Sequence, residues 1–399
     1  MTDQRRLPEM EFIALTAMLF ATIAFSIDAM LPALTIMGEE LSPADPERGT
    51  LVIGIFVLGM GIGTFFAGPL SDAYGRKTII LGGYFFYLIG AVISALAADL
   101  EWLLAGRLLQ GVAVAGPRIA ALAMVRDLYS GERMAAISSY SMMLFVLVPA
   151  IAPLIGQTIM EAFGWRAIFV AFVVFALWVA SWLSIRQPET LRPDDRVPMS
   201  ARAMINAVVE CLSNRVFRFS VTVLTLTFAS LFALISLVQP IYAVSFDAAE
   251  TFPYWFAVSA LLAMPGNFLN GRLVTRYGMR FMVKSAILGH LIVTIITLAL
   301  HLTVGLTIEL FLIYTTSFMF SMGFVFPNLT ALSMEPMGHI AGLAASVNGA
   351  ISTVIAAFLA IPVALSFDGT PYAILIWTLS GLAIAYLLML RLGPRPENG

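Results

Sequence analysis

The sequence predicts an all-α integral membrane protein, with twelve transmembrane helices arranged as two pseudo-symmetric bundles of six. Of the 399 residues, 60% are hydrophobic and 12% are charged, whereas a soluble domain has about half apolar and about a quarter charged residues. The apolar residues form blocks of about 20, the length that crosses a hydrocarbon core of about 30 Å. Several motifs of the first half also recur in the second half.

The apolar blocks can be followed in order along the chain. Six lie at about 11–36, 49–70, 79–98, 102–126, 135–160 and 166–186, and six at about 217–243, 251–272, 281–302, 306–331, 341–366 and 372–392. The first block is too long for a cleavable signal peptide and is interpreted as a span. The connection between the sixth and seventh blocks is longer than the others, and it combines Arg, Asp and Pro with an amphipathic stretch. We therefore expect an N-terminal bundle in 1–186, a cytoplasmic linker in 187–216 and a C-terminal bundle in 217–399.

The two halves resemble each other. Three prolines of the first half have counterparts in the second, at offsets of 208, 210 and 209 residues: Pro32 and Pro240, Pro117 and Pro327, Pro153 and Pro362. The loop Gly68–Lys77 also matches Gly271–Arg280 at an offset of 203 residues. These matches indicate duplication of a six-helix unit, although prolines are common in membrane helices generally. Repeats of this kind place a substrate site between the halves, near the bilayer midplane.

Positive charge predicts the orientation, because cytoplasmic loops are enriched in Lys and Arg. With both termini cytoplasmic, that side contains the arginine-rich linker and Arg5, Arg6, Arg76, Lys77, Arg126, Arg133, Arg272, Arg276, Arg280, Lys284, Arg391 and Arg395. The opposite side keeps Arg48 and Arg166. We expect a monomeric, multi-pass protein of the inner (cytoplasmic) membrane, with both termini cytoplasmic and the lipid bilayer as its partner.

Asp28 is the most informative single residue, because it lies inside the first span, one turn before Pro32. A carboxylate at this depth costs several kcal/mol unless it is paired, hydrated or protonated. Asp28 is therefore a candidate proton carrier in the substrate cavity. A fixed structural ion pair is the alternative interpretation.

Two arginines lie inside the fourth span. Arg107 is at nearly the same depth as Asp28 and is its expected partner, with Gln110 one turn below on the same face. Movement of Asp28 and Arg107 apart would act as a proton switch, whereas an Arg107 side chain that extends to the membrane surface would not. Arg118 lies closer to the cytoplasmic edge. It either extends to the cytoplasm or lines the cavity and attracts an anionic or polar group.

Uncharged polar residues inside the spans mark a candidate cavity wall. They are Gln157, Gln239, Tyr242, Asn267, Asn328 and Asn348. Hydrogen bonding between helices is the alternative role for these residues, because buried amides need partners.

The loop Gly68–Lys77 combines residue types that a tight connection between two spans requires. Gly68 permits close helix approach and Gly75 permits a tight turn. Asp72 can cap a helix or pair across helix ends, while Arg76 and Lys77 fix the orientation.

The sequence contains no GxSxG, Walker A or HExxH pattern. The single cysteine, Cys211, rules out an internal disulfide and a cysteine-based metal cluster. His290 and His301 lack the paired carboxylates of a metal site. We expect no enzymatic activity, no metal, no cofactor and no nucleic-acid partner. A small-molecule substrate would have to move by secondary transport, and Asp28 makes the proton the expected coupling ion.

The chain resembles the major facilitator superfamily over essentially its whole length. Gly68–Lys77 is similar to the superfamily's loop motif G-x-L-x-D-x-x-G-R-K, and Arg107–Gly111 is similar to its fourth-span motif. Pro149–Gly156 resembles the fifth-span motif of drug:proton antiporters. Together with Asp28–Leu34, Trp165-Arg166 and Pro188–Leu191, these segments resemble the twelve-span exporters of the bicyclomycin/chloramphenicol-resistance (Bcr/CflA) type.

The resemblance implies proton-driven export of small amphipathic compounds or drugs by alternating access. It implies that Asp28 is the carboxylate that takes up the proton and is linked to substrate binding. Arg107 would be the fourth-span arginine that is coupled to Asp28. The gate would consist of Gly68, Asp72, Gly75, Arg76 and Lys77, and the hinge of Pro149, Pro153 and Gly156.

Two departures from the pattern concern the fourth and fifth spans. Leu122 stands where members of this branch often have an arginine, and Arg118, one turn away, can take its place. Pro149 stands where the broader motif has glycine, which stiffens the hinge.

Other functions fit parts of the pattern. A proton-coupled or facilitative transporter of a metabolite such as a sugar, an amino acid or an organic acid is the first alternative. The acid-bearing first half favours the exporter, because a cluster of amides and Trp in the second half would be expected for sugar uptake. A membrane sensor or scaffold has no need for costly intramembrane charges, and an intramembrane enzyme fits less well still.

Overall fold

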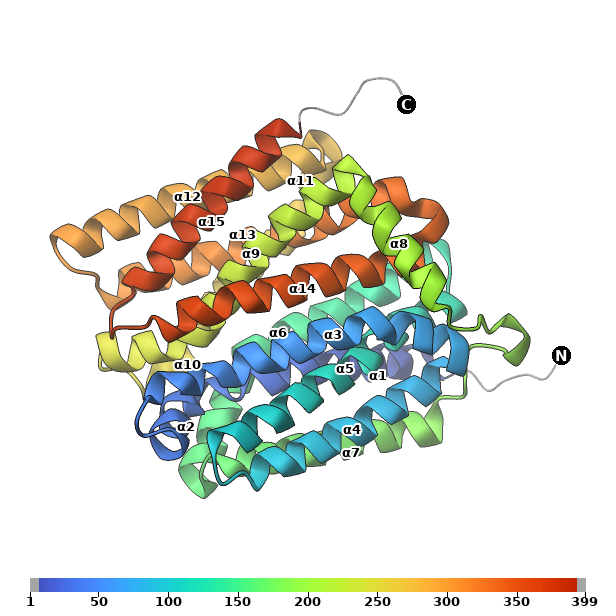
Figure 1. Cartoon of the computed structure of the whole chain (residues 1–399), viewed down its shortest axis with the longest axis horizontal. Coiled ribbons are helices and arrows are strands. Elements are labelled where there is room, and N and C mark those ends of the chain that lie inside the picture. The colour runs from blue at the N-terminus through green and yellow to red at the C-terminus, as the bar shows by residue number, and fades with distance from the viewer. Residues whose placement is uncertain (1–6, 393–399) are drawn as a thin grey trace. The chain divides into compact units, whose positions relative to one another are not determined.

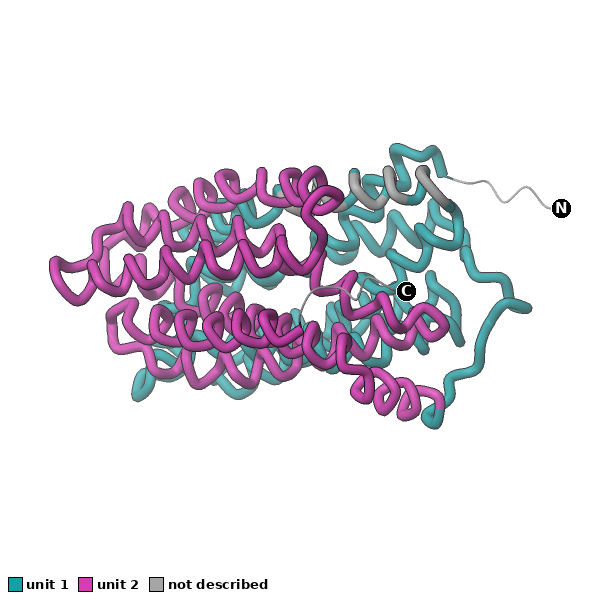
Figure 2. Tube along the Cα trace, turned by 90° about the horizontal axis from the view of Figure 1, so that it is seen from above, with its two compact units in different colours: residues 1–202 teal, residues 203–399 magenta. Residues whose placement is uncertain are grey.

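The computed structural model describes residues 7–392, without the side chains of residues 131, 132, 135, 136, 138, 139 and 142–146. Arg5, Arg6 and Arg395 lie outside this range. The chain divides into two compact units, Met1–Arg202 and Ala203–Gly399, which are coloured separately in Figure 2. The boundary between the units falls within residues 187–216.

Within the first unit the long helices run side by side (Figure 1). Its helices are α1 (Glu9–Asp28), α2 (Leu34–Leu41), α3 (Leu51–Tyr74), α4 (Arg76–Ala95), α5 (Leu100–Leu128), α6 (Gly131–Phe163) and α7 (Arg166–Arg186). Three short 3₁₀ turns, η1 (Leu31–Ala33), η2 (Pro46–Thr50) and η3 (Pro193–Asp195), complete the unit. The helix α5 packs against both α3 and α4, and α1 packs against α6.

The second unit repeats this order after a connecting helix. Its helices are α8 (Ala201–Ser213), α9 (Arg215–Pro240), α10 (Phe252–Ala263), α11 (Pro265–Tyr277), α12 (Met279–Thr303), α13 (Ile308–Met334), α14 (Ala341–Leu365) and α15 (Tyr372–Arg391). A π-helical turn, η4 (Ile241–Ser245), follows α9, and a 3₁₀ turn, η5 (Glu335–Ile340), follows α13. The amphipathic stretch expected in the linker is the helix α8.

The expected twelve-span organisation is confirmed. Among the described residues, nine helical segments are long and apolar enough to cross a membrane, and one of them, Ile308–Leu365, contains two spans, α13 and α14. The other two expected spans are α6 and the interrupted span formed by α10 and α11.

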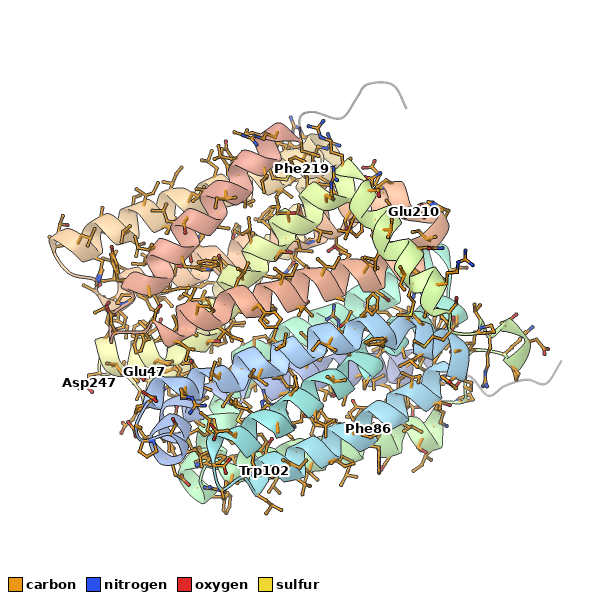
Figure 3. All side chains as sticks on the ribbon, viewed as in Figure 1. Glu47, Phe86, Trp102, Glu210, Phe219 and Asp247 are labelled. Atoms are coloured by element: carbon orange, nitrogen blue, oxygen red, sulfur yellow. The ribbon has the colours of Figure 1, made fainter. Side chains whose placement is uncertain are left out.

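Large apolar side chains on the outside of the units fit a lipid environment. Phe86 on α4 is 52% exposed and Trp102 on α5 is 60% exposed. Both lie on the outer side of the first unit in Figure 3. A soluble protein rarely exposes large contiguous apolar patches, whereas the bilayer is itself an apolar solvent.

Prolines interrupt the first span of each unit at corresponding places. Pro32 lacks the N–H that would bond to the carbonyl group of Asp28 four residues earlier, and α1 ends at Asp28. In the second unit α9 ends at Pro240, which is followed by the π-helical turn. The duplication inferred from the sequence thus extends to local backbone structure.

The loops that connect the second and third spans also match. Gly75 has a φ of 101° between α3 and α4, and Gly278 has a φ of 77° between α11 and α12. A residue with a Cβ atom rarely adopts such angles. The predicted tight turn at Gly75 is therefore present, and it recurs 203 residues later.

Candidate functional site

Asp28 is a buried carboxylate in the first unit, with 5% of its surface exposed. It occupies the last position of α1, directly before the break that Pro32 causes. No ion pair joins Asp28 to a cation within the part of the chain that the structure describes. A buried carboxylate without a fixed cationic partner is available to bind a proton or a positively charged group.

Arg107 is fully buried in α5 and is bonded to groups other than the Asp28 carboxylate. Its Nη2 donates to the carbonyl oxygen of Ser26 at 2.9 Å, and its Nε donates to the carbonyl oxygen of Val52 at 3.2 Å. Its Nη1 donates to Oε1 of Gln110 at 3.2 Å. The direct pair expected between Asp28 and Arg107 is therefore not formed in this structure. Backbone carbonyl groups satisfy the guanidinium instead.

Gln110 supports Arg107 through this hydrogen bond and is itself fully buried. The ring of Phe56 also lies beneath the guanidinium, with the Cζ atom 4.2 Å from the ring centre. A cation above an aromatic face gains electrostatic attraction. Arg107 thus joins α5 to α1 and α3.

Two tyrosines of α4 form hydrogen bonds with hydroxyl groups of α1. The hydroxyl of Tyr84 lies 2.8 Å from Oγ1 of Thr22, and the hydroxyl of Tyr87 lies 2.6 Å from Oγ of Ser26. Because Arg107 binds the carbonyl oxygen of Ser26, three helices meet at this residue, two positions before Asp28. The sequence analysis missed this cluster, although the spacing of Thr22 and Ser26 and that of Tyr84 and Tyr87 each place a pair on one helix face.

The helix α6 packs directly against the turn that follows Asp28. Pro149 and Pro153 lie inside α6, and Gly156 follows them one turn later. A Cβ atom at Gly156 would lie 2.0 Å from the carbonyl oxygen of Ala29. This contact requires glycine, so the hinge expected in the fifth span adjoins the candidate proton site.

Arg118 is half-buried in α5. Its Nη1 lies 4.0 Å from the sulfur atom of Met60. Among the described residues no carboxylate forms an ion pair with Arg118. Its positive charge therefore lacks a fixed anionic partner in this conformation.

The expected gate residues form a charged network at the end of α3. Arg76 makes an ion pair with Asp72, and its Nε donates to Oδ2 of Asp127 at 3.0 Å. Its Nη1 donates to Oγ of Ser71 at 3.1 Å. The hydroxyl of Thr190 donates to the same oxygen of Asp127 at 2.8 Å. Arg76 therefore connects α3 with α5 and, through Asp127, with the segment that follows α7.

Glu189 caps the N-terminus of α4, where backbone N–H groups have no partner within the helix. Its Oε1 accepts from the N–H of Arg76 at 3.0 Å, and its Oε2 accepts from the N–H of Lys77 at 3.1 Å. A Cβ atom at Gly75 would lie 2.5 Å from Oε2 of Glu189. Neither Glu189 nor Asp127 was expected to contact the proposed gate residues. For Glu189 the sequence signal was only the resemblance of Pro188–Leu191 to a family motif.

The other two gate residues have simpler surroundings. Lys77 donates through Nζ to the carbonyl oxygen of Ser184 at 2.7 Å, which fastens α4 to α7. Gly68 is half-buried within α3. The copy of this loop in the second unit has different contacts, because Arg280 donates to the carbonyl oxygen of Leu392 at 3.4 Å.

The candidate cavity residues of the second half have varied surroundings. Asn328 donates to Oδ1 of Asn270 at 2.6 Å. This is a hydrogen bond between helices, the alternative to a cavity role for such a residue. Tyr242 is fully buried among aromatic rings, with its ring stacked on that of Trp255 at 6.5 Å. Asn267 is exposed on α11.

The remaining candidates are amides on three helices. Gln239 on α9 and Asn348 on α14 are buried. Gln157 on α6 is half-buried and donates to Oε1 of Glu161 at 2.6 Å. Within the described part of the chain, no group of three or more His, Cys, Asp or Glu side chains could hold a metal ion.

Twelve spans in two related six-helix units, with an embedded carboxylate and a charged loop, define the class of multi-pass secondary transporters. The model of the Major Facilitator Superfamily matches residues 14–361, and the chain belongs to this family of transporters.

Several individual proteins are similar to the chain. An uncharacterized MFS-type transporter, YdgK, of Bacillus subtilis is 26% identical over 334 residues, which are 81% of each chain. A bicyclomycin resistance protein homolog of Haemophilus influenzae is 27% identical over 280 residues, 69% of each chain. The multidrug resistance protein MdtL of Salmonella typhi is 28% identical over 207 residues, about half of each chain (50% of this chain and 51% of MdtL).

Solved structures share the fold at low sequence identity. A D-xylose-proton symporter has a TM-score of 0.77 at 14% identity, covering 97% of this chain and 98% of the symporter. The human organic anion transporter MFSD10 has a TM-score of 0.71 at 15% identity, covering 96% of this chain and 100% of that protein. At these identities the similarity concerns the fold alone.

Proposed function

We propose that the protein is a proton-coupled exporter of small amphipathic compounds, of the bicyclomycin/chloramphenicol-resistance type, in the inner membrane. The observation that carries this proposal is Asp28, a buried carboxylate inside a span without an ion-pair partner among the described residues. The similarity to proteins named for bicyclomycin and multidrug resistance supports the substrate class.

In this mechanism Asp28 binds either a proton or the substrate, and the two compete. Arg107 is bonded to the carbonyl group of Ser26, two residues before Asp28, and so holds the end of α1 in place while the carboxylate changes its occupant. The contact of Gly156 with Ala29 on the other side of Asp28 lets α6 follow a movement of this turn. Arg118 supplies positive charge for an anionic or polar group of the substrate.

The gate acts through Arg76 in the same mechanism. The ion pairs of Arg76 with Asp72 and Asp127 hold together the ends of α3 and α5. Both termini and this network are cytoplasmic, as the distribution of Lys and Arg predicts. Breaking and re-forming the network accompanies alternating access to the two sides of the membrane.

Substitution of Asp28 tests the proposal. In proteoliposomes with an imposed pH gradient, the Asp28→Asn variant should lose gradient-driven drug transport, because an amide cannot release a proton. Substrate binding, measured by thermal shift against a panel of drugs and metabolites, identifies the compound used. Glu47→Gln is the matched control, because Glu47 is an exposed carboxylate outside the spans. Full gradient-driven transport by Asp28→Asn across pH 6 to 8 would overturn the role of Asp28.

A further inference from the structure

The helix α8 exposes an apolar stripe. Ile205 is 62% exposed, Val209 is 60% exposed and Leu212 is 39% exposed. Successive helical residues are separated by about 100°, so these three positions form one continuous stripe. Met204, Ala207 and Cys211 form a separate, buried face of the same helix. The stripe is thus additional to the face that packs within the protein.

Polar side chains lie beside the stripe on α8, and one of them ties the helix to its unit. Glu210 lies 2.5 Å from Nε2 of His339 in η5, which fastens α8 beside the turn that joins α13 to α14. Arg202 and Asn206 are both exposed on the polar side of α8, so Arg202 adds a cation directly beside the stripe. Figure 1 shows α8 running across the general direction of the spanning helices of its unit. Glu210 on α8 and Phe219 near the start of α9 are labelled in Figure 3.

The same end of the second unit is strongly basic. Arg215 donates to the carbonyl oxygen of Arg391 at 3.1 Å, so the start of α9 and the end of α15 lie together. Seven cations belong to this end: Arg215, Arg218, Arg272, Arg276, Arg280, Lys284 and Arg391. They outnumber the acidic residues Glu210 and Glu335.

We propose that α8 lies in the headgroup layer of the membrane, with the stripe Ile205, Val209 and Leu212 inserted at the acyl boundary and the adjacent arginines bound to anionic phospholipids. An amphipathic helix with an apolar face and neighbouring cations binds an anionic bilayer surface in this manner. On an anionic surface, each nearby Arg or Lys raises the equilibrium constant for membrane binding by about fivefold.

Charge complementarity selects the lipid surface over a protein partner. A second copy of the chain would present the same cations to this end and would be repelled. The bilayer supplies both parts of the complement, because phosphate groups match the arginines and acyl chains match the stripe. The inference does not depend on the transported compound or on proton coupling.

Fluorescent labels on neighbouring residues of α8 test the proposal. Ile205→Cys and Asn206→Cys are both exposed positions about 100° apart on the helix, and each is labelled with an environment-sensitive fluorophore. The native Cys211 can remain, because burial raises the pKa of its thiol to about 11 and the side chain is inaccessible. The full-length variants are reconstituted in vesicles of phosphatidylethanolamine with phosphatidylglycerol, and separately with phosphatidylcholine.

In the anionic vesicles, a quencher attached to the lipid acyl chain should quench the label at Ile205 several-fold more than the label at Asn206. Aqueous iodide should show the opposite order. Replacing phosphatidylglycerol by phosphatidylcholine, or combining Arg202→Gln with Arg218→Gln, should reduce the lipid quenching at Ile205.

Other results would overturn the proposal. Equal iodide quenching at both positions in vesicles would place the stripe in water. Protection of Ile205 from iodide already in detergent, with no effect of the lipid quencher, would mean that protein covers it. Energy transfer between differently labelled copies would identify a second chain as the occupant. Lipid quenching that is independent of phosphatidylglycerol and of both arginines would disprove the anionic contact.

Discussion

At the scale of single residues, Arg107 shows how an embedded charge is stabilised without a counter-charge. Its three donor groups bond to two backbone carbonyl groups and one side-chain amide. The planar guanidinium suits this arrangement, because its five N–H groups point in fixed directions. Asp28, which is close in sequence to one of these acceptors, is left available for a proton or a substrate.

Replacing the guanidinium by an ammonium group should therefore destabilise the protein even though the charge is retained. Arg107→Lys leaves the carbonyl oxygens of Ser26 and Val52 without their present donor, at a cost of about 1–3 kcal/mol for each buried group. The measurement is the thermal unfolding temperature in detergent. Arg118→Lys is the matched control on the same helix, since among the described residues the guanidinium of Arg118 contacts only the sulfur atom of Met60 at hydrogen-bonding range. Equal shifts for the two variants would contradict this account.

At the scale of secondary-structure elements, close packing beside Asp28 depends on a glycine, Gly156, which has no side chain. The α6 backbone at Gly156 approaches the carbonyl oxygen of Ala29, and α1 is already broken at this point by Pro32. The proline-containing helix α6 and the turn η1 with Pro32 therefore meet where the candidate proton carrier is located. Movement of α6 against α1 would change the surroundings of Asp28 directly.

A methyl group at this contact should separate the two helices. Gly156→Ala places a Cβ atom 2.0 Å from the Ala29 oxygen, and the backbone shift should cost about 1–3 kcal/mol. We expect a lower unfolding temperature and slower transport. Gly82→Ala is the control, because a Cβ atom there meets no atom within 4 Å. A neutral Gly156→Ala with an unchanged transport rate would show that the contact is not needed.

At the scale of the whole molecule, the two units share a frame but differ in their charges. The breaks at Pro32 and Pro240 and the turns at Gly75 and Gly278 recur in both. The embedded residues Asp28, Arg107 and Arg118 belong to the first unit alone. Proton coupling is therefore proposed as a property of the first unit, on a scaffold that both units provide.

The orientation proposed for this scaffold can be measured with single cysteines in a Cys211→Ser background. Asp45→Cys and Asp194→Cys are exposed positions outside the spanning helices. A membrane-impermeant maleimide should label Asp45→Cys in intact cells and Asp194→Cys only in inverted vesicles. The reverse pattern would place the basic loops outside and refute the cytoplasmic assignment.

The sequence by itself determined the number and the approximate positions of the spans, the duplication and the presence of charges inside the spans. These features follow from composition, from the fixed rise per residue of a helix and from the residue types that turns require. Depth along a helix is only one coordinate, however. The sequence placed Arg107 level with Asp28 but could not determine which way its side chain pointed around the helix.

The tertiary structure alone decided which groups meet. It placed Arg107 on the carbonyl groups of Ser26 and Val52, joined Tyr87 to Ser26, and brought Glu189 and Asp127 into contact with Arg76, a proposed gate residue. These contacts join residues up to 113 positions apart, and they depend on the rotation and packing of whole helices. Hydrophobic periodicity does not specify that rotation in a span that is apolar on nearly every side, so only the packed structure could assign the partners.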